Sequence, residues 1–198
     1  MIATEVISML RTEGKGIEIT SLFSHSDKDK AQSLAKANRI ARVYTDYTQL
    51  LKEDDADFVY IALVNSAHYD YVRQALEADR NVIVEKPFTT SLSQAEELAS
   101  LARSRNLYLF EAVSLLHTPN FKLVKDSLTR IAPIHLVQCN FSQYSSRYER
   151  YLQGDIAPAF NPKLGGGAMN DLNVYNINTV IGLFGEPLTT TYYANRGH

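Results

Sequence analysis

The chain has 198 residues, of which 45% are hydrophobic and 21% are charged, so we expect a packed core and not a disordered chain. Its formal net charge is −2 and its basic residues form no run, so we expect neither nucleic acid nor a membrane as a partner. No apolar stretch approaches the roughly 20 residues of a membrane span, and the first residues lack the pattern of a secretory signal.

Alternating elements are predicted over the first 110 residues from the spacing of apolar side chains. In chain order they are a helix starting at Ile2 and ending near Gly14, a strand over Ile17–Phe23, a helix around Ala31–Ala35, a strand over Ala41–Tyr44, a helix capped by Asp46, a strand over Phe58–Leu63, a helix over Tyr69–Ala78, a strand over Asn81–Val84, a helix capped by Ser91 or Ser93, and a strand over Leu107–Phe110. Short connections between alternating strands and helices predict a parallel sheet with right-handed crossovers.

The pattern changes in the second part of the chain. We predict a long strand over Ile134–Tyr144, an irregular stretch to Gly166, a helix over Asp171–Phe184 and a strand over Leu188–Ala194. We place the domain boundary between Leu116 and Ile134 and assign residues 1–118 to the first domain and 119–198 to the second.

Cys139 is the single cysteine of the sequence. One cysteine cannot form an internal disulfide, which suits a reducing compartment, so we expect a cytoplasmic protein. No cluster of histidine and cysteine surrounds it, and we interpret Cys139 as a small buried hydrophobic residue. We expect no metal site.

Polar residues directly after the strands are the first candidates for chemistry, because ligands of parallel sheets bind at the carboxyl ends of strands. Ser24 and His25 follow the first predicted strand, where a side chain that is not acidic favours NADP, or the use of both NAD and NADP, as cofactor. A solvated polar turn explains these two residues about as well. Glu85 and Lys86 follow a buried strand, where Lys86 could serve in proton transfer or be a surface lysine paired with Glu85.

Two further segments carry weaker signals on their own. Asn65 and His68 would project into the crevice after the strand over Phe58–Leu63, beside a helix that Ser66 could cap. Asp171 and Tyr175 follow three consecutive glycines and, four residues apart, would share one face of a helix. An acid and a phenol there could orient a substrate hydroxyl, or Asp171 could simply stabilise the helix dipole.

Taken in order, these segments resemble the family of glucose–fructose oxidoreductase, inositol dehydrogenase and the MocA proteins. The matching segments are residues 60–69 (YIALVNSAHY), residues 82–88 (VIVEKPF) and residues 165–175 (GGGAMNDLNVY). They are similar to the family's I-A-T-P-N-x-x-H, E-K-P and G-G-G-x-x-x-D-x-G-x-H/Y motifs.

The resemblance implies hydride transfer between NAD or NADP and a hydroxyl or carbonyl group of a sugar or polyol. It implies that Lys86, Asp171 and Tyr175 are catalytic and that the cofactor contacts Asn65, His68, Glu85 and Lys86. We also expect the cofactor to contact Ser24, His25 and Ala62, which follow predicted strands or end them. It also implies a homo-oligomer, either a dimer or larger. The alternatives are a nucleotide- or sugar-sensing protein without catalysis, and an inactive fragment of the same fold.

The sequence departs from the family pattern in several places. The usual first strand and its G-x-G-x-x-G loop, which seats the pyrophosphate on a helix N-terminus, do not precede Met1-Ile2-Ala3. We therefore expect a chain truncated at both ends: a Rossmann-type parallel sheet without its first strand, then the start of an α+β domain with a mostly antiparallel open sheet. Asn173 replaces a usual glycine, and Leu116 stands where some relatives have arginine.

Overall fold

The structure is a computed structural model, and it describes residues 2–194. The described residues divide into two compact units, one ending at Ala112 and the other beginning at Val113. We call these the N-terminal unit and the C-terminal unit, and we describe each by itself. The division falls before the boundary that the sequence predicts after residue 118.

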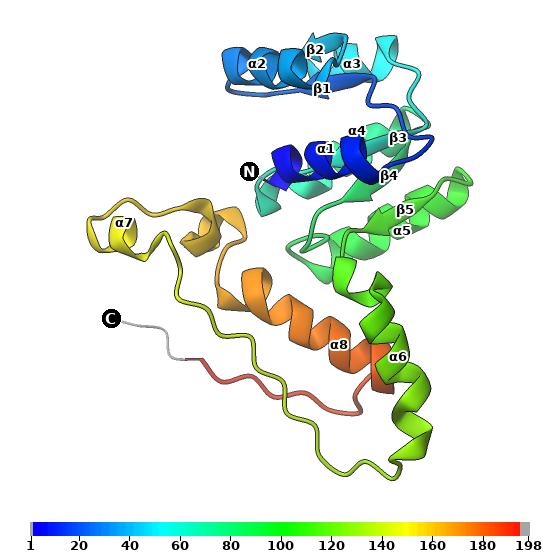
Figure 1. Cartoon of the computed structure of the whole chain (residues 1–198), viewed down its shortest axis with the longest axis vertical. Coiled ribbons are helices and arrows are strands. Elements are labelled where there is room, and N and C mark those ends of the chain that lie inside the picture. Colours follow the sequence, from blue (N-terminus) through cyan, green and yellow to red (C-terminus); the bar gives the residue numbers. More distant parts are fainter. Residues whose placement is uncertain (1, 195–198) are drawn as a thin grey trace. The chain divides into compact units, whose positions relative to one another are not determined.

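Helices and strands alternate along the N-terminal unit, as the sequence predicts (Figure 1). They are α1 (Ile2–Glu13), β1 (Ser21–Phe23), α2 (Lys28–Asn38), β2 (Arg42–Tyr44), α3 (Tyr47–Glu53), β3 (Phe58–Ile61), η1 (Asn65–Ala67), α4 (His68–Glu77), β4 (Asn81–Val84), α5 (Leu92–Ser104) and β5 (Leu109–Glu111). Here η1 is a single turn of 3-10 helix.

Side-chain caps explain where several of these helices begin. The Asp46 carboxylate accepts a hydrogen bond from the Gln49 amide at 3.1 Å at the start of α3, as predicted. Ser91, and not Ser93, caps α5, because its hydroxyl oxygen accepts the Gln94 amide at 3.4 Å. Each cap satisfies an amide that the first turn of a helix leaves without a partner.

Every strand pairing in the N-terminal unit is parallel, which confirms the predicted α/β class. β1 pairs with β2, and β3, β4 and β5 form a second sheet in that order. No pairing joins β1 to β3 among the described residues, so the strands form two parallel sheets, as a Rossmann-type sheet without its central first strand would. β1 is shorter than the predicted strand because only the residues opposite β2 make strand hydrogen bonds.

One hydrophobic core nevertheless contains side chains from both sheets. Tyr44 of β2 belongs to the same buried cluster as Ile61 of β3 and Val82 of β4. The Phe23 ring centroid lies 5.2 Å from that of Tyr47 and 5.6 Å from that of Tyr71, which joins β1 to α3 and α4. Burial of these side chains holds the unit together where strand pairing does not.

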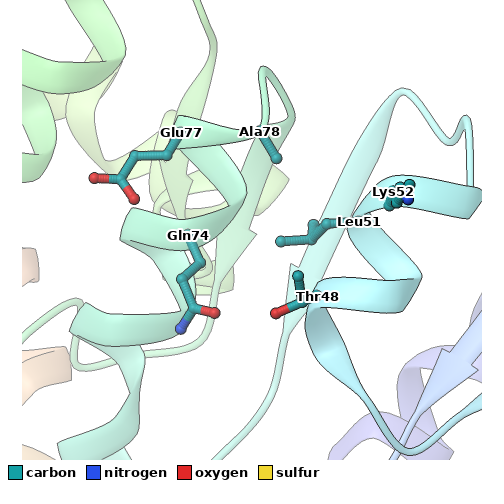
Figure 2. Close-up of a pocket in the computed structure, with 6 residues that line it drawn as sticks. All are labelled: Thr48, Leu51, Lys52, Gln74, Glu77 and Ala78. Carbon is teal, nitrogen blue, oxygen red and sulfur yellow. The ribbon is translucent and has the colours of Figure 1, made fainter.

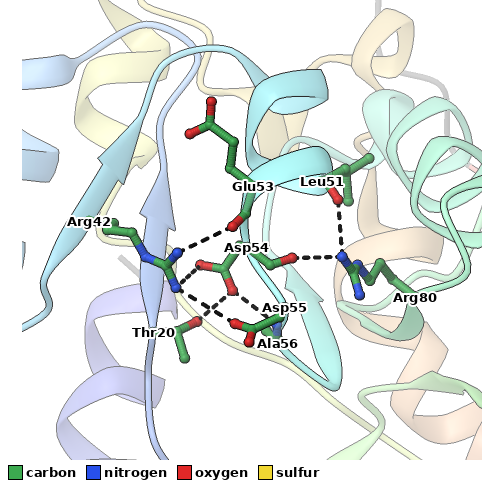
Figure 3. A network of polar contacts seen from close by, with 8 residues as sticks. All are labelled: Thr20, Arg42, Leu51, Glu53, Asp54, Asp55, Ala56 and Arg80. Atoms are coloured by element: carbon green, nitrogen blue, oxygen red, sulfur yellow. Dashed lines mark hydrogen bonds and ion pairs between the residues drawn. The ribbon is translucent and has the colours of Figure 1, made fainter.

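A network around Asp54 ties together the amino ends of the strands (Figure 3). Asp54 is 3% exposed, and its Oδ1 accepts hydrogen bonds from the Thr20 hydroxyl and the Ala56 amide, both at 3.0 Å. Its Oδ2 lies 3.1 Å from the Arg42 guanidinium as an ion pair without an aligned hydrogen bond. Arg80 donates to the Asp54 carbonyl at 2.7 Å. Burial raises the pKa of Asp54, but hydrogen bonds from Ser21, Ala56 and Thr20, together with the charge of Arg42, outweigh it and lower that pKa overall.

The C-terminal unit is helical in the part of the chain that the structure describes. Its helices and turns are η2 (Ser114–His117), α6 (Pro119–Ser127), η3 (Leu128–Arg130), α7 (Tyr148–Leu152), η4 (Pro158–Phe160), η5 (Pro162–Leu164), η6 (Met169–Asn173) and α8 (Val174–Phe184). The sequence predicts the last helix but not α6, although the Thr118 hydroxyl caps it on the Phe121 amide at 3.2 Å and proline opens it.

The two strands predicted for this unit do not form between residues 113 and 194, so the antiparallel sheet is not confirmed. Residues 134–144 and 188–194 are extended segments without strand hydrogen bonds (Figure 1). Several of their apolar side chains are exposed to solvent: Leu136 is 77% exposed and Leu188 is 103% exposed. Strand propensity is realised only against a neighbouring strand. Cys139 lies on the first of these segments and is exposed, so the prediction of its burial is wrong.

Candidate active site

The carboxyl ends of β3, β4 and β5 lie level with one another. Ile61 is opposite Val84 in the sheet, and Val84 is opposite Glu111. The Glu85 amide extends this ladder by donating to the Ile61 carbonyl at 2.9 Å. The residues that follow β3 and β4, including Ala62 and Lys86, therefore leave the sheet at one edge, where the sequence predicts the cofactor site.

Glu85 is held by a tyrosine that the sequence interpretation missed. The Tyr60 hydroxyl on β3 donates to Glu85 Oε1, and Glu85 Oε2 accepts the Lys86 amide at 3.3 Å. Burial, together with this hydrogen bond and the negative charge of Glu85, raises the pKa of Tyr60. The parallel register contained the signal, because Tyr60 lies opposite Ile83 and the side chains of Ile83 and Glu85 point to one face of the sheet.

His68 lies inside the N-terminal unit and not in the crevice. Its side chain is 0% exposed. Ring nitrogen Nδ1 is 2.8 Å from the Pro87 carbonyl oxygen, and Nε2 is 3.3 Å from the Leu63 carbonyl oxygen. A carbonyl can only accept, so Nδ1 carries the proton of the shorter contact. The expectation that His68 projects toward the ligand thus differs from the structure, because tertiary packing places the first turn of α4 beneath the chain that follows β4.

Glu111 at the end of β5 is a second residue that the sequence interpretation missed. Its Oε1 accepts the Phe88 amide at 2.8 Å. Burial raises the pKa of Glu111, and the negative charge of Glu85 adds to that rise, while the Phe88 amide and His68 act against it. Glu111 also lines a depression of about 350 Å³ whose walls include Ala99, Leu107 and Leu109, which are apolar.

Asn65, Ser24 and His25 also stand at the carboxyl ends of strands. Asn65 is half-buried and begins η1, directly after β3. Ser66 caps nothing there, since α4 begins after Ala67 without a side-chain cap. Ser24 accepts the Asp27 amide on its hydroxyl oxygen at 3.2 Å, and His25 is exposed. Ser24 and His25 therefore lie on the turn between β1 and α2, as predicted.

Asp171 and Tyr175 lie in the C-terminal unit, after the glycine-rich loop. A side chain on Gly166 would collide with the Pro158 carbonyl oxygen at 2.4 Å, so the close approach requires glycine there. Asp171 is in η6, a π-helical turn, whereas Tyr175 is in the α-helix α8. The α-helical spacing assumed for this pair does not hold through η6. The Tyr175 ring stacks on Phe141 at 5.3 Å, and the approach of this pair to Lys86 remains a prediction.

The edge formed by β3 and β4 fits a nicotinamide cofactor. Ala62 has a short side chain, and Asn65, Glu85 and Lys86 are half-buried groups that can hydrogen-bond an amide or a ribose. Such an edge of a parallel sheet is where dinucleotides bind in doubly wound folds. Ala62, Asn65, Glu85 and Lys86 would therefore hold the nicotinamide end.

A separate groove of about 410 Å³ lies between α3 and α4 (Figure 2). Thr48 and Leu51 line one side and Gln74, Glu77 and Ala78 line the other. It contains none of the predicted site residues. Between residues 2 and 194, no three acidic, histidine or cysteine side chains gather as metal ligands would. Within the same range no helix combines the length and the apolar character that crossing a membrane requires.

Comparison with known proteins identifies relatives that match most of the chain. It is 33% identical over 186 residues to the uncharacterized oxidoreductase YgjR of Escherichia coli (strain K12), covering 94% of this chain and 56% of that protein. It is 32% identical over 170 residues to scyllo-inositol 2-dehydrogenase (NADP(+)) IolU of Bacillus subtilis (strain 168), covering 86% of this chain and 52% of that protein. A crystal structure of myo-inositol 2-dehydrogenase from Lactobacillus plantarum has a similar fold, with a TM-score of 0.81 over 93% of this chain and 53% of that one, at 17% identity.

The chain thus spans about half the length of the curated relatives it matches. The sequence profile of the oxidoreductase family with an NAD-binding Rossmann fold matches residues 1–113, which is more than half of the chain. That range contains the parallel sheets and the Glu85-Lys86-Pro87 turn. The chain therefore belongs to the Gfo/Idh/MocA family of oxidoreductases.

Proposed function

We propose that this chain carries out hydride transfer between NAD or NADP and a hydroxyl or carbonyl group of a sugar or polyol. The position of Lys86 is the main support for this proposal, since it leaves the parallel sheet at the carboxyl edge, on a turn held by hydrogen bonds. The relative named scyllo-inositol 2-dehydrogenase acts on a cyclitol, which supports a polyhydroxylated substrate.

The proposed mechanism assigns one proton to Lys86. Ala62, Asn65, Glu85 and Lys86 would hold NAD(P), which when bound would supply the hydride acceptor for oxidation of the substrate hydroxyl, or the hydride donor for reduction of the carbonyl. Neutral Lys86 takes the hydroxyl proton during oxidation, becomes an ammonium and releases that proton to solvent. In reduction the ammonium donates the proton to the new alkoxide. Asp171 accepts a hydrogen bond from the substrate, and Tyr175 orients the substrate or shares the proton transfer.

Cofactor binding and turnover test this function in two steps. Isothermal titration with NAD⁺, NADH, NADP⁺ and NADPH measures binding, and absorbance of the reduced nicotinamide measures turnover with sugars and polyols. We expect binding of at least one cofactor pair and turnover that Lys86→Ala abolishes while the cofactor dissociation constant stays within about threefold. Failure of the whole chain to bind any of the four forms contradicts the proposal. Binding without turnover of any sugar or polyol favours the sensing alternative.

We further propose that the protein is a cytoplasmic homo-oligomer, dimeric or larger. Large apolar side chains exposed in the C-terminal unit, among them Leu136, Leu188 and Tyr193, support burial against another copy. The single cysteine suits a reducing compartment. Light scattering after size exclusion should give at least twice the chain mass, and a monomer at micromolar concentration would contradict the oligomer.

A further inference from the structure

The peptide group between Pro87 and Phe88 is hydrogen-bonded at one end by a buried side chain and at the other by a half-buried one. Its carbonyl oxygen, on Pro87, accepts from His68 Nδ1 at 2.8 Å. Its N–H, on Phe88, donates to Glu111 Oε1 at 2.8 Å. His68 belongs to α4 and Glu111 to β5, so elements from two parts of the unit fix one peptide plane.

These two contacts are not incidental to the packing. His68 is fully buried, and a buried polar ring is unfavourable unless its nitrogens find partners. Burial likewise disfavours the ionised carboxylate of Glu111 and raises its pKa. An apolar pair would fill the same space without these penalties. Both side chains nevertheless meet the same peptide group, one residue after Lys86.

The turn is independently held on the other side of Lys86. The Tyr60 hydroxyl bonds the Glu85 carboxylate, and the Glu85 amide completes the β3–β4 ladder. Lys86 therefore lies between two anchored points, with Pro87 buried directly after it. The residues on both sides of Lys86 therefore limit the freedom of its backbone.

We propose that His68 and Glu111 are positioning residues that clamp the Pro87–Phe88 peptide and thereby fix Lys86 at the edge of the sheet. This inference rests on the proposed function, in which Lys86 transfers the proton. A displacement of about 1 Å in a catalytic group can lower a rate by about 100-fold. Loss of either clamp contact should lower kcat by roughly 10- to 100-fold with a much smaller change in KM.

Paired variants separate the hydrogen bond from the space that each side chain fills. Glu111→Gln keeps a carbonyl oxygen that accepts the Phe88 amide, whereas Glu111→Ala removes it. His68→Asn keeps a donor close to the Nδ1 position, whereas His68→Leu removes it. Tyr47→Phe is the matched control, since it deletes a side-chain hydrogen bond to the Tyr71 carbonyl, 3.2 Å long, in the same core.

Three readouts on the whole chain test the clamp. Amide hydrogen exchange at Phe88 should accelerate at least about tenfold in Glu111→Ala and stay within about threefold of wild type in Glu111→Gln. The NMR signal of ¹³C-dimethylated Lys86 should shift in Glu111→Ala and His68→Leu but not in their conservative partners. The value of kcat should follow the same order, with Tyr47→Phe close to wild type.

Two results would overturn the inference. One is unchanged Phe88 exchange and an unchanged Lys86 signal in Glu111→Ala and His68→Leu. The other is an equal loss of kcat in Tyr47→Phe, which would show a general stability effect. If the wild-type chain turns over no substrate, the proposed function fails, while exchange and the Lys86 signal still decide whether the clamp exists.

Discussion

Glu111 accepts a hydrogen bond from the Phe88 amide in the turn after β4, but its negative charge opposes folding. Its carboxylate is half-buried beside apolar walls and close to Glu85, and its pKa is raised. An acid with a raised pKa in the folded state contributes most to stability when it is protonated, and it loses that contribution as the pH rises through the folded pKa. Glu111 is therefore least favourable to folding at neutral and alkaline pH.

Glu111→Gln should consequently gain stability over wild type as the pH rises. The amide still accepts the Phe88 N–H but has no charge to desolvate. We expect the free energy of unfolding of Glu111→Gln, minus that of wild type, to increase between pH 4 and pH 8 in urea titrations. A difference that decreases over this range would show that the Glu111 charge stabilises the fold.

His25 provides a residue-scale test of cofactor choice. It is exposed on the turn after β1, where the adenosine ribose is expected. His25→Asp places a carboxylate where a 2′-phosphate would lie, and like-charge repulsion of about 1.4 kcal/mol weakens NADP⁺ binding about tenfold. The NAD⁺ dissociation constant should change little, and His135→Asp in the C-terminal unit should change neither. If His25→Asp weakened the binding of NADP⁺ and NAD⁺ equally, the 2′-phosphate would not lie at this turn.

At the scale of elements, caps were predictable and long-range burial was not. Asp46 and Ser91 predict the starts of α3 and α5, because a helix cap depends only on residues that are close in sequence. Thr118 before Pro119 carries the same local information for α6, and the sequence interpretation did not use it. The strand predicted over residues 134–144 is not formed, because a strand depends on a partner that local sequence does not reveal.

The candidate site shows the same division between local and distant information. Lys86 and Glu85 could be placed at a strand end from the apolar run before them. The burial of His68 and the contact from Glu111 could not, because they depend on α4 and β5 meeting one turn from different parts of the chain. Tyr60 was within reach only through the β3–β4 register.

Asp54 links β1, β2, α3 and β3, and its loss should destabilise all of them together. Asp54→Asn removes the negative charge that accepts hydrogen bonds from Thr20 and Ala56 and pairs with Arg42. Hydrogen bonds to a charged group contribute about 1.5–3 kcal/mol. We expect a loss of about 2–3 kcal/mol in the free energy of unfolding at pH 7. Asp55→Asn is the matched control, since Asp55 is 97% exposed and 3.9 Å from Arg42, and should change stability by less than about 0.5 kcal/mol.

The pH dependence of this loss follows from the lowered pKa of Asp54. An acid with a lowered pKa stabilises the fold above its unfolded pKa, and the contribution disappears as the pH falls through the folded pKa. The difference between wild type and Asp54→Asn should therefore shrink when unfolding is measured at pH 3 or below. A difference that is constant from pH 7 to pH 3 would show that the charge is unimportant.

At the scale of the whole molecule, the Asp54 network and the proposed catalytic turn lie at opposite ends of the strands of the N-terminal unit. Thr20, Arg42, Asp54 and Arg80 lie at or before the amino ends of their strands, whereas Glu85, Lys86 and Glu111 lie at or after the carboxyl ends. Changes at the first edge should alter unfolding without altering cofactor affinity in the folded protein. The C-terminal unit contributes Asp171 and Tyr175 to the proposed site. Its described residues contain no paired strand.

Transfer of an isotopic label tests most directly whether this chain is a dehydrogenase. The whole chain would be incubated with NAD⁺ or NADP⁺ and a polyol such as scyllo-inositol deuterated at its ring carbons, and the cofactor analysed by mass spectrometry. We predict reduced cofactor that carries one deuteron from the substrate carbon, formed by wild type and not by Lys86→Ala. Reduced cofactor without the label, or no reduced cofactor with any polyol or sugar supplied, would contradict hydride transfer by this chain.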